Sequence, residues 1–338
     1  MTLTLAHRSS AAGPRFREPE RVRMAIRKLK SLRDGDVGVI ETIASGPGAV
    51  PALAEILFAR EPSGLYETRR RAVEALSGLR AYDVLRRFLT EPRKLSDPVE
   101  RMGEEAVVNA AARALGDCRD GQDLPLLLTL LQRKPLPGVI EAVGKFRRPE
   151  VLPHFIEALA DDFTRPAAEE AIRAIGTKAK PALLQTALRR EPRFGGEANS
   201  SRARRRSALG ILLKFGLSRK FAWPPLHELI EDADPWVSVL SASMCLASAM
   251  EDDTQRAICR LIELLKTPDT ILTAEIEECL VRRFDLARLV IGAAIEGGLA
   301  ESDPDEPWWL RDKALTALLR VKARAEGKPS GNEADERD

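Results

Sequence analysis

The stretch LPHFIEAL, residues 152–159, decides the fold of this chain because close variants of it recur along the sequence. The variants are VPALAEIL at residues 50–57, LPLLLTLL at 124–131, KPALLQTAL from Lys180 and WPPLHELI at 223–230. In each copy apolar residues recur at spacings of three and four, which places one apolar stripe on one face of a helix. Proline suits the first helical turn, where its missing N–H has no intrahelical acceptor. Each copy therefore predicts one helix, here called an A helix.

The prolines of these copies define a common position that is repeated along the chain. The residues at this position are Pro51, Asp83 in DVLRRFL, Pro125, Pro153, Pro181, Pro224 and Cys259 in CRLIELL. Successive positions are separated by 28 to 43 residues, a period typical of stacked helical pairs. We therefore expect an A helix to start at each of them.

A second kind of segment, ending in small residues, lies between the A helices and predicts a partner, the B helix. Its endings include AVEALSGL at 72–79, ARALGD at 112–117, EAVGKF at 141–146 and IRAIGT at 172–177, and looser versions follow at 212–216, 245–250, 279–284 and 317–321. We expect the glycines of the first four endings to form left-handed caps; they are Gly78, Gly116, Gly144 and Gly176. Asp97-Pro98 and Asp234-Pro235 predict starts of B helices.

Neither helix of such a pair can bury its apolar stripe alone, so neighbouring pairs must stack. The sequence thus predicts an all-α fold, an α-α superhelix of the HEAT/armadillo-like solenoid class with about eight helical pairs. We expect a single repeat domain over residues 19–324. The segments 1–18 and 325–338 are polar and rich in small or charged residues, so we expect them to be disordered tails.

This arrangement of paired helices resembles the HEAT-repeat superfamily. Between about Asp117 and Gly176 it is most similar to the short bacterial repeats named after phycobilisome lyases. The resemblance implies an α-solenoid over nearly the whole chain. It implies several functions, because arrays of this kind serve as scaffolds, adaptors, lyase subunits and DNA repair enzymes, and the matching residues are packing residues.

Composition excludes several functional classes. The 53 Lys and Arg residues are balanced by 51 Asp and Glu residues, so the net charge of +2 gives no global attraction to nucleic acid or anionic membranes. The four cysteines form no CxxC pair, which favours a reduced, cytoplasmic location. No signal peptide, membrane span, nucleotide-binding loop, nucleophile motif or two-histidine site is evident. We therefore expect a non-enzymatic protein with no cofactor and no metal.

The loops that join A to B helices carry the long insertions. They are residues 59–68, 91–101, 190–206 and 299–309. In a solenoid these loops fall on one side, here called the A-to-B edge, and insertions kept to one side often mark the working surface. The alternative is that loop tips simply tolerate insertions.

Arginines gather at the first turns of B helices on the same edge. They are Arg69, Arg70, Arg71, Arg202, Arg204, Arg205 and Arg206. A cation at a helix N-terminus opposes the helix dipole, so dipole and arginine together predict an edge that attracts anions. The alternative is a solvated surface neutralised by nearby glutamates. If the arginines are exposed, changing Arg202, Arg205 and Arg206 to Glu should weaken partner capture and leave the thermal midpoint nearly unchanged.

Three tryptophans are further candidates for partner binding. Trp236 follows Asp234-Pro235 at a B-helix start, and Trp308 and Trp309 open the last predicted helix. The alternative for Trp236 is half-burial against a loop, and for the other two it is sealing the end of the core.

The most economical function is a non-catalytic scaffold or adaptor that binds another protein, one with an acidic surface, through the concave B-helix face and the A-to-B edge. Binding of nucleic acid or another polyanion along the arginines is the alternative. A third is an enzyme resembling HEAT-like DNA glycosylases, for which Trp308 with Asp312 is the only suggestive pair. A lyase subunit is a further possibility.

Overall fold

The structure is a computed structural model that describes residues 18–90, 93, 95–216, 224–248, 251–297 and 308–327. The tails predicted at the two ends lie almost entirely outside the described residues. The chain divides into two compact units, Met1–Arg147 and Arg148–Asp338. Each unit is an all-α stack of helical pairs, as the repeats predict.

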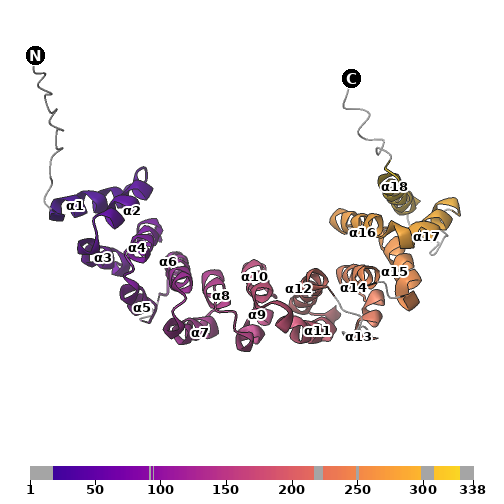
Figure 1. Cartoon of the computed structure of the whole chain (residues 1–338), viewed down its shortest axis with the longest axis horizontal. Helices are drawn as coiled ribbons and strands as arrows, with labels where there is room; N and C mark the ends of the chain where they lie inside the picture. Colours follow the sequence, from indigo (N-terminus) through magenta and orange to yellow (C-terminus); the bar gives the residue numbers. More distant parts are fainter. Residues whose placement is uncertain are drawn as a thin grey trace, which may run out of the picture. The chain divides into compact units, whose positions relative to one another are not determined.

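The first unit holds four pairs in two layers (Figure 1). Its A helices are α1 (Glu18–Leu29), α3 (Val50–Phe58), α5 (Tyr82–Thr90) and α7 (Leu124–Arg133). Its B helices are α2 (Gly35–Ala44), α4 (Glu67–Gly78), α6 (Pro98–Cys118) and α8 (Pro137–Gly144). In the B layer α2, α4, α6 and α8 contact each other in order, and in the A layer α3, α5 and α7 do the same.

The second unit continues the pattern. Its A helices are α9 (Leu152–Ala158), α11 (Lys180–Leu188), the short α13 (Pro224–His227), α15 (Glu251–Leu264) and α17 (Phe284–Glu296). Its B helices are α10 (Arg165–Ile175), α12 (Asn199–Phe215), α14 (Pro235–Ala247), α16 (Thr270–Arg282) and α18 (Trp308–Ala325). Short 3-10 turns lead into several A helices: Pro47–Ala49, Gly121–Asp123, Pro149–Val151 and Gly176–Ala179. Another, Glu228–Glu231, extends α13.

The helix starts follow the local signals in most places. Pro51, Pro125, Pro153 and Pro181 each stand in the first turn of an A helix. Asp97 and Asp234 cap α6 and α14 by accepting backbone N–H groups. The prediction at Cys259 is wrong, because α15 begins at Glu251 and runs through that position. Proline is excluded from a helix interior by its ring, but cysteine is not, so the helix can begin before Cys259 and continue through it.

Most of the glycines at the B-helix ends do not form the helix caps predicted for them. Gly78 and Gly116 are still helical, and the left-handed residues that follow are Arg80, Arg119 and, after Gly144, Arg147. A Cβ on Gly116 would lie 2.6 Å from the Cα of Ala142 in α8. Gly78 and Gly116 therefore allow neighbouring B helices to approach closely. Of the four glycines Gly176 has a positive φ, 79°, but its ψ of −151° differs from that of the expected left-handed cap.

The inserted loop between α11 and α12 is a small hairpin. Its strands β1 (Pro192–Arg193) and β2 (Gly196–Glu197) pair antiparallel, and Ser201 of α12 donates to the carboxylate of Glu197. Because α11 and α12 pack against each other on either side of it, the hairpin lies within a repeat rather than between two domains.

We keep a single cooperative repeat domain over residues 19–324 as a proposal. Trypsin should cut first at the exposed Arg193, and the two fragments should still elute together from a gel-filtration column, since the α11–α12 contact survives the nick. Fragments that separate as two folded species would contradict the proposal.

Candidate functional site

The A-to-B edge is built from the ends of A helices, the first turns of B helices and the loops that join them. Arg69, on the first turn of α4, is buried with 5% of its surface exposed. Its Nε donates to the carbonyl of Leu57 at the end of α3 at 2.9 Å, and its Nη1 lies 2.6 Å from the Glu104 carboxylate of α6. The guanidinium also lies over the ring of Phe88, 5.6 Å from its centroid.

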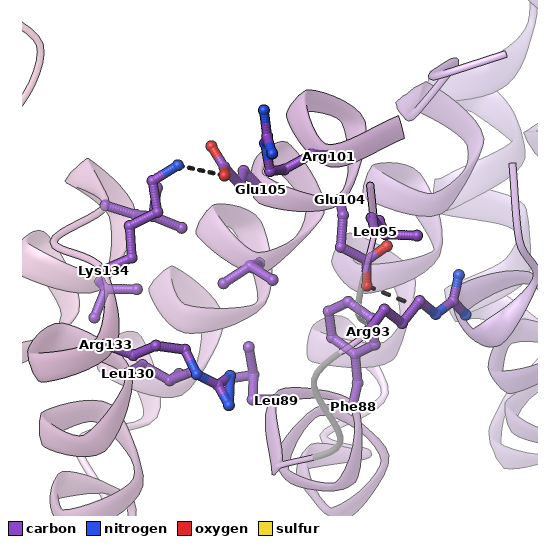
Figure 2. A pocket seen from close by; sticks show the side chains of 13 residues that line it. Phe88, Leu89, Arg93, Leu95, Arg101, Glu104, Glu105, Leu130, Arg133 and Lys134 are labelled. Atoms are coloured by element: carbon purple, nitrogen blue, oxygen red, sulfur yellow. Dashed lines mark hydrogen bonds and ion pairs between the residues drawn. The ribbon is translucent and has the colours of Figure 1, made fainter. Parts of the chain in front are cut away.

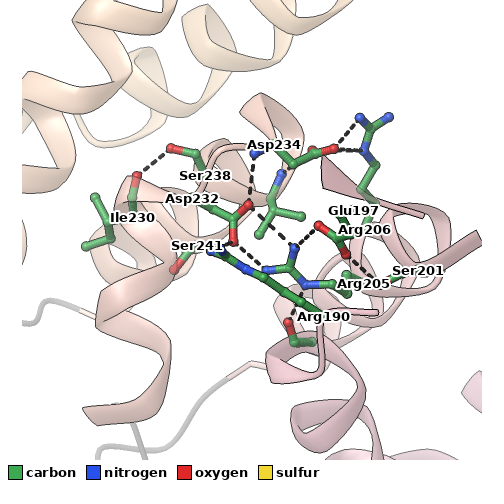
Figure 3. A network of polar contacts seen from close by, with 12 residues as sticks. Arg190, Glu197, Ser201, Arg205, Arg206, Ile230, Asp232, Asp234, Ser238 and Ser241 are labelled. Atoms are coloured by element: carbon green, nitrogen blue, oxygen red, sulfur yellow. Dashed lines mark hydrogen bonds and ion pairs between the residues drawn. The ribbon is translucent and has the colours of Figure 1, made fainter. Parts of the chain in front are cut away.

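Arg205 of α12 repeats this geometry in the second unit (Figure 3). It is fully buried, and its Nε donates to the carbonyl of Ala187 near the end of α11 at 2.8 Å. Its Nη1 binds the carboxylate of Glu197 at 2.7 Å, and its Nη2 binds that of Asp232. Burial alone would raise the pKa of Asp232, but hydrogen bonds from Arg205, the Asp234 backbone N–H and Arg190 hold that pKa below its usual value.

These contacts explain why Arg69 stands on the first turn of α4, where the dipole of its own helix disfavours a cation, whereas Arg205, the seventh residue of α12, lies beyond the first turn. Each side chain reaches back to the C-terminus of the preceding A helix, where unpaired carbonyls carry partial negative charge and a cation is stabilising. Arg165 of α10 does the same with the carbonyl of Leu159 after α9. The dipole that stabilises these arginines is therefore that of the preceding A helix, not that of the helix that carries them.

The remaining candidate arginines also have partners inside the chain. Arg71 donates to the Ser31 carbonyl, Arg70 binds Glu67, Arg202 donates to the Glu197 carbonyl, Arg204 binds Glu157 and Glu191, and Arg206 binds Asp234. The expectation that all of them stand exposed on an anion-attracting edge needs correcting, because Arg69, Arg71 and Arg205 are buried. Arg70, Arg202, Arg204 and Arg206 are half-buried, and their role in partner binding stays a prediction.

Of the three candidate tryptophans, the structure describes the side chain of Trp236 alone. Trp236 is half-buried, and its Nε1 donates to Asp269, the N-cap of the next B helix α16, at 3.2 Å. Backbone N–H groups of α16, together with the Trp236 hydrogen bond, lower the pKa of Asp269. Trp308 and Trp309 begin α18, and their side chains lie outside the described residues.

Exposed apolar side chains on the A-to-B edge are the feature that the sequence argument missed. Nine of the thirteen large apolar residues that stand exposed in the described parts of the chain lie on or beside A-to-B loops. They are Leu32, Val37, Leu65, Tyr66, Val99 and Met102 in the first unit and Phe163, Phe194 and Ile271 in the second. Isolated exposed apolar residues are ordinary, but a concentration on one edge is typical of binding surfaces. A single large apolar residue within a polar loop, as in PRFGGE, was the available signal.

A pocket of about 190 Å³ opens on this edge in the first unit (Figure 2). Phe88 and Leu89 of α5, Leu130 of α7, and Leu136 and Val139 beside and within α8 form an apolar lining, and all five are buried. The inserted loop between α5 and α6 supplies Arg93 and Leu95. Arg93 donates to the carbonyls of Phe58 and Ala59, which holds the loop against the end of α3.

The charged residues at this pocket are unequally paired. Glu104 is bound by Arg69 at 2.6 Å and faces Arg93 at 3.7 Å, and Glu105 is bound by Lys134. Arg101 and Arg133 are exposed, and their side chains form no hydrogen bond or ion pair with any residue that the structure describes. The pocket therefore has two cationic groups whose charge the neighbouring carboxylates do not neutralise.

Comparison with known proteins adds one structural similarity. No protein-family model matches the chain, and no curated protein matches it. The chain is similar to a solved structure, the complex of CpcE and CpcF of phycocyanin lyase from Nostoc sp. PCC7120. The identity is 22%, the TM-score is 0.32, and the match covers 77% of this chain and all of the other.

The expectation that this protein is not an enzyme is corrected by that comparison, because the similar structure belongs to a lyase.

In the described ranges no group of three or more His, Cys, Asp and Glu residues is placed to hold a metal. Burial raises the pKa of the Cys245 thiol to about 12. Within the same ranges, no helix has both the length and the apolar character needed to cross a bilayer.

Proposed function

We propose that this protein binds another protein along the A-to-B edge of its helical repeats. The observation that carries the proposal is the concentration of exposed apolar side chains on that edge, on or beside the loops that join the two packed layers. Burying one large apolar side chain against a partner contributes about 1.5–3 kcal/mol, so a few such side chains are enough for specific capture.

The partner has an acidic surface. Arg101 and Arg133 support this, since both are exposed and lack a carboxylate partner in the described structure. Nucleic acid is a weaker choice, because the clustered arginines that suggested it are engaged within the chain and a polyanion would have to displace those contacts. A cytoplasmic location, and a contribution from the concave B-helix face, stay predictions.

Serine substitutions at these exposed side chains test the proposal. Leu65→Ser with Met102→Ser in the first unit, or Phe163→Ser with Phe194→Ser in the second, should reduce recovery of the native partner at least about tenfold, since each change removes apolar contact area from the interface. Recovery is measured by quantitative mass spectrometry after affinity purification from the native cells, and the thermal midpoint should barely change.

Leu289→Ser with Leu319→Ser is the matched control, because these residues are also exposed but lie in the middle of α17 and α18, away from the A-to-B loops. The control should retain the partner. Equal losses in the control and the edge variants, or no loss in either, would refute the docking edge.

A further inference from the structure

The pocket beside the α5–α6 loop has the size of one aromatic ring. An enclosed apolar cavity of about 150 Å³ lined by Leu, Ile and Phe accommodates benzene, and this pocket of about 190 Å³ has an apolar lining of the same kind. The lining comes from α5, α6, α7 and α8, which pack against one another, so the pocket is preformed. Binding a ring there would not require the backbone to move.

The charged residues around the pocket favour a ligand with negatively charged groups near the ring. Arg101 is exposed on the first turn of α6, and Arg133 ends α7, so the two unpaired guanidinium groups come from different helices that line the pocket. Glu104 and Glu105 already have cationic partners. A ligand with carboxylates near the ring therefore matches the pocket, whereas a ligand with ammonium groups would meet like charge.

Apolar surface outside the pocket favours a polypeptide segment over a free aromatic acid. Met102 stands exposed next to Arg101 on α6, and the exposed Val99 packs against Gly64, which precedes the exposed Leu65; none of these side chains lines the pocket itself. A single ring with one carboxylate could fill the pocket but would leave this apolar area uncovered. A segment that continues past the ring would cover it.

We infer that this pocket binds an aromatic side chain of the partner protein, within a segment whose neighbouring residues are acidic. The inference rests on the proposed function and names the anchor of the same interface. The ring fills the apolar pocket, the carboxylates on either side bind Arg101 and Arg133, and the rest of the segment lies along the A-to-B loops.

A synthetic peptide provides the direct test with the full-length protein. The probe is a blocked, fluorescein-labelled peptide in which one central phenylalanine is flanked by aspartates on both sides, measured by fluorescence anisotropy at low ionic strength. We expect saturable binding with a dissociation constant below about 1 mM. Replacing the phenylalanine with alanine should weaken binding about tenfold or more, and replacing the aspartates with lysine should abolish it.

Two protein variants locate the peptide. Val108→Phe places a ring in the pocket from α6, and we expect it to weaken peptide binding at least tenfold. Arg101→Gln with Arg133→Gln should weaken binding roughly tenfold at low salt and flatten its salt dependence, because the screened attraction has been removed. If Val108→Phe lowers the thermal midpoint, Leu95→Trp fills the pocket from the loop instead.

The outcomes separate this inference from the proposed function. Peptide binding that neither pocket-filling variant reduces, or phenylacetate binding as tightly as the peptide, would overturn the inference. Retention of the native partner by Val108→Phe, combined with its loss in the serine variants at the A-to-B edge, would also overturn it and leave the docking edge in place. Loss of both peptide and native partner on filling the pocket supports it.

Discussion

Replacing Arg205 with methionine is expected to lower the free energy of unfolding by about 3–5 kcal/mol. The guanidinium is fully buried, and its removal leaves the Asp232 carboxylate and the Ala187 carbonyl without their main donor in a site that water does not reach. Arg190 also binds Asp232, but its side chain is half exposed and compensates only in part. Urea unfolding followed by circular dichroism measures the loss.

Arg202→Gln is the control, because Arg202 is only half-buried and donates to the Glu197 carbonyl alone. We expect that change to cost less than about 1 kcal/mol. Changing Arg202, Arg205 and Arg206 together to Glu should therefore unfold the second unit, which reverses the expectation drawn from the sequence. A loss below about 1 kcal/mol in Arg205→Met would show that the cluster contributes little to stability.

Phe155→Ala is expected to cost about 3–5 kcal/mol of unfolding free energy. Phe155 has no exposed surface and stands in α9, which contacts α10, α11 and α12. Removing the ring loses the transfer free energy of its atoms and leaves a cavity that three neighbouring helices cannot all close. The same urea titration reports the change.

His154→Ala provides the comparison from the adjacent position. His154 is partly exposed on the other side of α9, so its replacement should alter stability by no more than about 0.5 kcal/mol. Similar losses in the two variants would contradict the assignment of Phe155 to the core.

Most of the fold could be read from the sequence because its signals are local. Pro51, Pro125, Pro153 and Pro181 mark helix starts through the geometry of their own ring, and apolar spacings of three and four define a buried face without reference to any other helix. Two of the repeated positions carry no proline: at Asp83 the predicted helix start was right, and at Cys259 it was wrong.

The roles of the arginines and glycines could not be read in the same way. Arg69 and Arg205 looked like free cations because most of their partners, at Leu57, Glu104, Ala187 and Asp232, lie 12 to 35 residues away in the sequence. Gly116 looked like a cap, yet its role depends on the approach of Ala142 in the next B helix. A pattern within one helix carries no information about which atoms another helix brings beside it.

The sequence by itself determined the helical pairs and their order, and it predicts that the long loops lie on the A-to-B edge. Only the tertiary structure decided which side chains on that edge are available to a partner. Arginine was expected to be exposed there, but Arg69 and Arg205 are buried because they bind A-helix carbonyls and carboxylates of neighbouring segments. Leu65, Met102 and Phe194, by contrast, remain exposed to solvent. Exposure depends on what packs against a residue, and in a stack of helices those neighbours come mostly from the adjoining repeat.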